Sequence, residues 1–426
     1  MIVPRRRFFI LLAIGFAFSL LGFISPAAGG LQYLYYLALM IAAGIDIAMI
    51  PRKKDFSVKR THEKYLSIGA YNPIRFSVTN RSAYRGDIEI RDEYPDEMET
   101  IDDRIVFPSA PMSVISASYT LRPLKKGDYS FPGAQMRVSG RMGLIARQYR
   151  YELPTEFKVY PNILELRKYL MMFRMNRLEQ IGYKRPVHGG ENEFDFLREF
   201  LPGDNYRKIN WKATAKHRYP IIEVDEKEYN RNVFTLIDSG RMMTTRYGDL
   251  TKLDYAVDAS LILAGAASRK KDFFGLLTFS DKIHTYIKPS RKNRVLNEVL
   301  GVLYKVEPDY LRTDYIAAYR YLMHRLRKNS IIFIFSELYD RIVSKDLIRL
   351  LQLLSDHHQI YFVSFEESEE TARGTTLDEI ARRVMQEEQT VEKESVVKEL
   401  SKTGIKTIRV NAGNIKQKVV NTYLSL

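Results

Sequence analysis

Two apolar stretches near the start of the chain constrain its fold more than any other feature. Residues 8–24 carry no charge, and residues 31–50 carry only Asp46. A helix of about 17–25 apolar residues crosses the hydrocarbon core of a bilayer. Basic residues flank the pair at both outer ends, whereas the turn between the stretches is uncharged. By the positive-inside rule, we predict a transmembrane hairpin over residues 1–54 with both ends cytoplasmic.

This hairpin predicts a multi-pass protein of the cytoplasmic (inner) membrane with the bulk of its chain in the cytosol. A cleaved signal peptide is the alternative for the first stretch, because its start is basic and small residues follow it at Ala27 and Ala28. Asp46 lies about one helical turn before the end of the second stretch. We therefore expect it at the membrane interface rather than in a functional site within the bilayer.

Residues 55–161 show short stretches in which apolar and polar residues alternate, as at Ile74, Phe76 and Val78. This period of two is typical of half-buried antiparallel strands. Turn-forming residues separate the stretches. We predict a β-sandwich domain here, acting as a spacer or interaction module. Residues 162–187 are predicted to be a helical linker, with its helix over 163–185.

Continuous apolar runs mark the last part of the chain, residues 232–426. They predict strands at 233–237, 274–279, 331–335, 361–365 and 405–410, with helical stretches between them. Such a pattern favours a doubly wound α/β domain whose parallel sheet is covered on both faces. Ligands of these sheets bind beyond the carboxyl ends of the strands, where we expect Asp238, Thr313 and Glu337 to meet. Thr313 is also a candidate N-cap for the helix that follows it.

The segment 188–231 has the most distinctive composition. It contains the only tryptophan, Trp211, and a basic run from Arg207 to Arg218 that follows several acidic residues. We predict a turn at 202–205 and a helix over 205–217, capped by Asp204 or Asn205.

Three interpretations of this segment remain open. The first is an anion or acidic-partner site formed by Arg207, Lys208 and Lys212. The second is acid–base chemistry by Glu199 and Asp204. The third, which the residue types favour, is a buried ion-pair network that holds an irregular loop, with Trp211 in the core.

The segment resembles the signature of domain of unknown function family 58. The matching pattern runs from Arg198-Glu199-Phe200 through Pro202-Gly203-Asp204 to Trp211-Lys212-Ala213. The resemblance spans nearly the whole chain and includes Val159-Tyr160-Pro161. Of the family's Asp-Pro-Phe-Gly-Leu turn, only Gly143-Leu144 is present. The signature or partner-binding positions that it implies are Arg198, Glu199, Gly203, Asp204, Arg207, Lys208, Trp211 and Lys212.

The same resemblance implies that residues 232–426 form a von Willebrand factor A-like domain. The metal site of such domains begins with an Asp-x-Ser-x-Ser run, which here starts at Asp238. Gly240 and Met242 stand where hydroxyl side chains are expected, and Glu337 stands where Asp is usual, whereas Thr313 matches. Magnesium needs near-octahedral oxygen ligands. We therefore predict a degenerate site without a metal.

Few catalytic chemistries fit this sequence. The absence of cysteine excludes thiolate metal sites and cysteine nucleophiles, and no Walker A, HExxH or GxSxG motif is present. The net charge of +15 includes a single dense cluster outside the membrane segment, so nucleic acid is not the expected partner.

The sequence predicts a membrane-anchored scaffold or chaperone-like adaptor that is not an enzyme and needs no cofactor. The resemblance implies no established enzyme activity. Proteins of the family that this chain resembles occur beside MoxR-type AAA+ ATPases and von Willebrand A-domain proteins. These two classes of protein are the partners we expect. The alternative is an uncharacterised enzyme or an anion- or nucleic-acid-binding protein that uses the carboxylates and basic run of residues 198–218.

Overall fold

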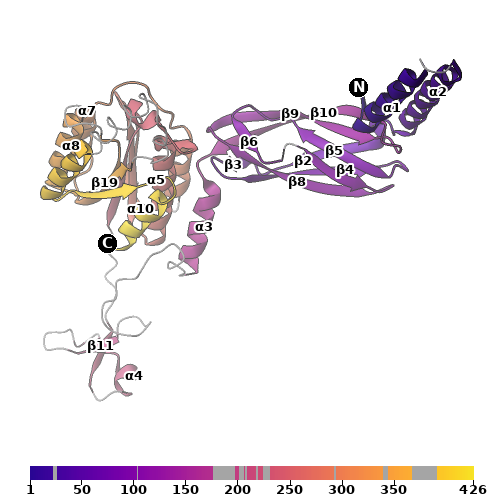
Figure 1. Ribbon diagram of the computed structural model, residues 1–426. Helices are drawn as coiled ribbons and strands as arrows, with labels where there is room; N and C mark the ends of the chain where they lie inside the picture. The colour runs from indigo at the N-terminus through magenta and orange to yellow at the C-terminus, as the bar shows by residue number, and fades with distance from the viewer. Residues whose placement is uncertain are drawn as a thin grey trace. The chain divides into compact units, whose positions relative to one another are not determined.

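The computed structural model (Figure 1) describes most of the chain. The described residues are 1–22, 26–102, 104–175, 197–200, 206, 209–216, 219–223, 231–291, 294–338, 344–366 and 391–426. They form two units, Met1–Glu165 and Leu166–Leu426.

Two helices, α1 (Arg6–Gly22) and α2 (Pro26–Met49), pack against each other in the first unit. The hydroxyl of Tyr35 donates a hydrogen bond to the carbonyl of Leu11 at 2.7 Å. Gly15 permits this approach, because a Cβ there would lie 2.7 Å from the Tyr35 ring. One helical stretch among the described residues, Leu31–Met49, is long and apolar enough to cross a membrane. Of the two predicted spans, the structure thus supports the second by length and composition.

Two sheets that face each other form the rest of this unit (Figure 1), and all of their strands except β1 follow the helices in the chain. Every second residue of β4 is buried, so the predicted alternation is confirmed in this strand. The first sheet contains β1 (Ile2–Pro4), β10 (Ile145–Tyr160), β9 (Gly127–Ser139), β5 (Gly86–Asp92) and β7 (Ile105–Ser109), with β3 (Tyr65–Ser67) beside β10. The second sheet contains β2 (Phe56–Thr61), β4 (Asn72–Asn80), β8 (Val114–Pro123) and β6 (Met98–Thr100).

A buried ion pair joins the two sheets. Arg60 of β2 donates to Asp92 at the end of β5 at 2.5 Å, and both side chains are 1% exposed. Tyr119 of β8 donates to the other oxygen of Asp92, also at 2.5 Å. Burial raises the pKa of Asp92, and the neighbouring Arg60 guanidinium acts against this shift. The Arg60 guanidinium also lies 4.5 Å from the ring centre of Phe131, so a cation–π interaction supports the pair.

Asp46 connects α2 to the sandwich. Its side chain is fully buried. One carboxylate oxygen accepts from the Met142 amide at 2.7 Å, and the other accepts from Leu144 and Ile145 at 2.9 and 3.0 Å. A Cβ on Gly140 would collide with this carboxylate. The residue expected at the membrane interface therefore binds the turn between β9 and β10, which contains the Gly143-Leu144 part of the family pattern.

The second unit contains a six-stranded sheet. Its strands are β13 (Asn232–Asp238), β16 (Phe273–Phe279), β17 (Ile283–Ser290), β18 (Ser330–Phe335), β19 (Gln359–Phe365) and β20 (Lys406–Val410). They lie in the order β17-β16-β13-β18-β19-β20. All five predicted strands are confirmed, and all five are parallel. Strand β17, an antiparallel edge strand whose residues are mostly half-buried, was not predicted from the sequence.

Helices cover both faces of this sheet (Figure 1). On one face, α7 (Tyr315–Met323), α8 (Lys345–Ser355) and a helix over 391–402 pack against the strands in a shared apolar core. On the other, α5 (Lys252–Arg269) packs with α6 (Val295–Tyr304) and α10 (Ile415–Leu424). The remaining short elements of this part are η4 (Arg241–Thr244), β14 (Arg246–Tyr247) and β15 (Leu250–Thr251).

The predicted linker helix begins as expected. Helix α3 spans Ile163–Arg174, and the rest of the predicted helix, residues 176–185, lies outside the described residues. A Cβ on Gly265 of α5 would lie 3.0 Å from Leu166 and 3.2 Å from Leu170. The small residue in α5 therefore provides the space in which α3 packs.

We predict that Asp46→Asn loosens the turn that follows β9. The substitution puts an amide N–H₂ group opposite backbone donors, and each buried donor left without a partner costs about 1–3 kcal/mol. The exposed Arg141 lies in this turn, so trypsin should cleave after it faster than in the unsubstituted protein. Mass spectrometry of the fragments measures the rate. Asp96→Asn, at an exposed position, is the control, and an equal rate in both variants would contradict the proposed role of Asp46.

Candidate functional site

The carboxyl ends of five parallel strands meet at one edge of the six-stranded sheet. This edge is where ligands of open α/β sheets bind. Asp238 ends β13, Ser280 follows β16, and Ser336 and Glu337 follow β18. The structure therefore brings together Asp238, Thr313 and Glu337 at this edge, as the sequence predicts.

Asp238 is fully buried and accepts four hydrogen bonds. One oxygen accepts from the Gly240 amide at 2.8 Å and from the Thr313 hydroxyl at 2.7 Å. The other accepts from the hydroxyls of Tyr315 and Ser336 at 2.8 and 2.7 Å. Burial and the Asp238 carboxylate raise the pKa of Tyr315, so this phenol stays protonated and able to donate. Protein groups thus satisfy the carboxylate that begins the degenerate metal motif.

The glycine in this motif has a packing role. A Cβ on Gly240 would collide with the hydroxyl oxygen of Thr313. The missing side chain at position 240 is therefore what allows Thr313 to reach Asp238. Met242, the second position without a hydroxyl, is half-buried, and its neighbour Met243 is fully buried.

Glu337, at the third position of the degenerate metal motif, pairs with lysine side chains. Its carboxylate pairs with Lys252 at 2.8 Å and with Lys393, which comes from the helix over 391–402. All three side chains are largely buried. Two ammonium groups therefore neutralise the charge that a divalent cation would otherwise balance.

The prediction that Thr313 caps the following helix is wrong. The N-cap of α7 is Asp314, whose carboxylate accepts from the Ala317 amide at 2.8 Å. Thr313 donates its hydroxyl to Asp238 instead. Both residue types cap helices well, and the long-range partner of Thr313 decides between them.

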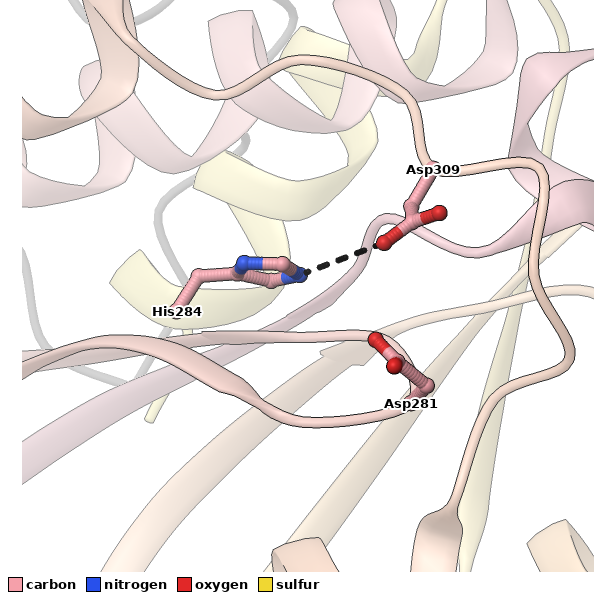
Figure 2. Close-up of side chains that lie close together, drawn as sticks. All are labelled: Asp281, His284 and Asp309. Atoms are coloured by element: carbon pink, nitrogen blue, oxygen red, sulfur yellow. Dashed lines mark ion pairs between the residues drawn. The ribbon is translucent and has the colours of Figure 1, made fainter.

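A second cluster at the same edge was missed by the sequence analysis. Asp281 lies on the turn between β16 and β17, His284 lies near the start of β17, and Asp309 lies on the loop before α7 (Figure 2). His284 Nε2 lies 4.0 Å from Asp309 Oδ2 and 2.7 Å from the buried Ser280 hydroxyl. Serine and aspartate therefore approach the same ring nitrogen, whereas a Ser-His-Asp triad uses opposite nitrogens. The available signal was an acidic residue and a histidine three apart after a buried strand.

The signature segment is described only in part. Gly203, Asp204, Arg207 and Lys208 lie outside the described residues. Strand β11 (Leu197–Glu199) pairs antiparallel with β12 (Ile221–Glu223), so the backbone of Arg198 lies opposite Ile222 and that of Glu199 opposite Ile221.

Two predictions about this segment are wrong. The helix of the segment, α4, spans only Trp211–Thr214, and Asn210 caps it by accepting from the Ala213 amide. Backbone pairing explains the short helix, because Ile209 forms a bridge with Ile222. Trp211 is 71% exposed, so it is not part of a buried core. Lys212 is exposed as well.

Part of the chain matches a family of unknown function. The family model described as "Protein of unknown function DUF58" matches residues 197–381. The uncharacterized protein YeaD of Bacillus subtilis (strain 168) is 23% identical over 189 residues, which are 42% of this chain and 46% of that protein. The match thus spans about half the length of this relative.

Solved structures give weaker similarities. The conserved hypothetical protein BatB from Bacteroides thetaiotaomicron is 14% identical, with a TM-score of 0.32 over 46% of this chain and 97% of that one. Alpha-2-macroglobulin from Escherichia coli, from domain MG7 to the C-terminus, is 14% identical, with a TM-score of 0.20 over 25% of this chain and 16% of that one. Scores this low carry no argument about function.

We predict that Gly240→Ser, which restores one hydroxyl of the metal motif, lowers stability and does not create a magnesium site. The new side chain collides with Thr313, and overpacking of this kind costs about 1–3 kcal/mol. Thermal unfolding followed by circular dichroism, with and without magnesium, measures both effects. Gly301→Ser is the matched control, because nothing lies near a Cβ at that position. A magnesium-dependent rise in melting temperature in Gly240→Ser alone would contradict this interpretation.

Proposed function

We propose that this protein is a membrane-anchored scaffold or chaperone-like adaptor that docks partner proteins at the carboxyl-end edge of its α/β unit. The observation that carries this proposal is the loop of residues 306–314, which we call the docking loop. Its Tyr310 and Leu311 side chains are 73% and 53% exposed. They lie next to the site formed by Asp238 and Thr313.

Backbone hydrogen bonds fix the docking loop to the turn that follows β13. The Asp309 amide donates to the Ser239 carbonyl at 2.7 Å, and the Arg241 amide donates to the Leu311 carbonyl at 3.1 Å. Thr313 anchors the end of the loop through Asp238. The backbone conformation that exposes Tyr310 and Leu311 is therefore fixed before any partner binds.

Such a loop suits protein recognition. Tyrosine is enriched among the residues that contribute most to binding free energy at protein interfaces. A surface whose backbone is already ordered loses less conformational entropy on binding. An exposed tyrosine next to an exposed leucine on a fixed loop therefore favours docking of a protein over binding of a small polar molecule.

The resemblance to family 58 supports a MoxR-type AAA+ ATPase or another von Willebrand A-domain protein as the partner. The strand order, with β13 central and β17 at the antiparallel edge, supports a von Willebrand A-like fold for the α/β unit. The placing of Asp238, Thr313 and Glu337 at one edge supports it further. The proposed role is then binding without catalysis, and the docking itself requires no cofactor at Asp238.

We also propose that α1 and α2 form a membrane hairpin and that the rest of the chain is cytosolic. Strand β1, which precedes α1, pairs with β10 of the sandwich, and β2, which follows α2, belongs to the same sandwich. Both outer ends of the helix pair therefore reach one folded unit. A single folded unit lies on one side of the bilayer, so this pairing supports two crossings.

A photo-crosslinking amino acid at position 310 tests the docking function. We expect light-dependent adducts in native membranes with a defined protein, identified by mass spectrometry as an AAA+ ATPase. The matched control is position 323, where Met323 is 47% exposed at the end of α7. Absence of adducts at 310, or the same adducts at 323, would contradict docking at this loop. Capture of a different protein only at position 310 would support docking at this loop and would contradict an AAA+ ATPase as the partner.

Single cysteines test the topology, because the chain contains none. We expect Ile2→Cys and Val391→Cys to react with a membrane-impermeant maleimide in inverted vesicles and to be protected in intact cells. Both positions are at least half exposed in the folded chain. Labelling of Ile2→Cys from outside, with Val391→Cys protected, would show a single crossing. The unsubstituted protein provides the background.

A further inference from the structure

We propose that Asp281, His284 and Asp309 bind a divalent transition-metal ion at a site separate from Asp238. One ligand atom from each side chain lies within 4.8 Å of the other two. Figure 2 shows the three side chains close together: Asp281 comes from the β16–β17 turn, His284 from β17 and Asp309 from the docking loop. This inference does not depend on the docking function.

The hydrogen bonds within the cluster do not supply both carboxylates with a proton donor, so a bound cation would stabilise them. The Ser280 hydroxyl lies 2.9 Å from Asp281 Oδ1, 3.0 Å from Asp309 Oδ2 and 2.7 Å from His284 Nε2. A hydroxyl has one proton to donate, and an ionised carboxylate can only accept. At most one carboxylate therefore receives a full hydrogen bond from Ser280, and the other faces an oxygen lone pair.

Lysine and arginine side chains do not supply positive charge to these carboxylates, and His284 carries a charge only when it is protonated. Within the part of the chain that the structure describes, neither Asp281 nor Asp309 forms an ion pair with lysine or arginine, although the chain has a net charge of +15. The contrast with Glu337, which has two lysine partners, is clear. Two carboxylates held this close destabilise each other when both are ionised, and a bound cation removes that repulsion.

The ligand types select the class of metal. Magnesium and calcium prefer oxygen ligands throughout, whereas a set with one imidazole and two carboxylates suits zinc, manganese, cobalt or iron. Bonds of about 2.0–2.2 Å to zinc require the ligand atoms to lie closer together than they do here. Asp281 and His284 are exposed, so rotation of their side chains supplies this closure. Three protein ligands leave a coordination position open to water.

The Asp309 backbone is already fixed for this role. Its amide donates to Ser239, and its Oδ1 accepts from the Leu311 amide at 3.2 Å. The Asp314 amide donates to the Ser280 carbonyl at 2.8 Å, which holds the two loops together. Oδ2 is thus the oxygen that is directed at His284. A metal bound here ties the docking loop to the β16–β17 turn.

Zinc and manganese binding to the full-length protein in detergent micelles tests the proposal. The protein carries no histidine tag and is first stripped with a chelator. Equilibrium dialysis should show one ion bound per chain, and cobalt should give visible absorption bands typical of mixed nitrogen and oxygen ligands. Zinc should also raise the melting temperature, because a ligand that binds only the folded state stabilises it.

Two variants separate the site from non-specific binding. His284→Gln should weaken zinc binding at least about 10-fold and abolish the zinc-dependent rise in melting temperature. The control is His324→Gln, which removes an exposed histidine outside the cluster and should bind as the unsubstituted protein does. No saturable binding below about 1 mM would overturn the proposal. So would a His284→Gln variant that folds, as judged by circular dichroism, and binds zinc unchanged.

Discussion

A buried carboxylate must regain from the protein the hydrogen bonds that it loses to water, and this constraint organises the α/β unit around Asp238. Its donors come from the adjacent turn and from segments 75, 77 and 98 residues away. One side chain thereby fixes the turn after β13, the docking loop, the start of α7 and the end of β18. Hydroxyl groups surround this carboxylate, and two lysines neutralise Glu337. Around Asp238 and Glu337, the edge is therefore held together by protein groups.

Much of the fold could be predicted from the sequence, because its signals are local. Four buried strands, β13, β16, β18 and β19, appear as largely apolar runs, since both of their faces are covered by helices. Strand β17 has one strand neighbour and a mixed sequence with a proline, so it lacks such a run. The helix expected at 205–217 failed for a different reason. Lysines recur there every four residues, a spacing that suits a helix, but Ile209 pairs with Ile222 instead.

The candidate site could be predicted only in outline. That Asp238, Thr313 and Glu337 share an edge follows from strand order and the family resemblance. The hydrogen-bond and ion-pair partners of these three side chains could not be predicted, because most of these partners are distant in sequence. Gly240 looked like a lost hydroxyl ligand, yet its absent side chain makes room for Thr313. His284 looked like one of several scattered histidines, because nothing in the sequence places it beside a loop residue 25 positions away.

The attachment of α2 to the sandwich through Asp46 has a mechanical consequence. A flexible linker would let the sandwich tumble relative to its anchor, but three hydrogen bonds and the β1–β10 ladder join helices and sheet at two points. Strand β10 runs for 16 residues from this junction to Tyr160, a length of about 50 Å. With α2 in a bilayer, the first unit is then a stiff spacer. The chain leaves the sandwich at Tyr160, so the length of β10 limits how close to the lipid surface this exit point can lie.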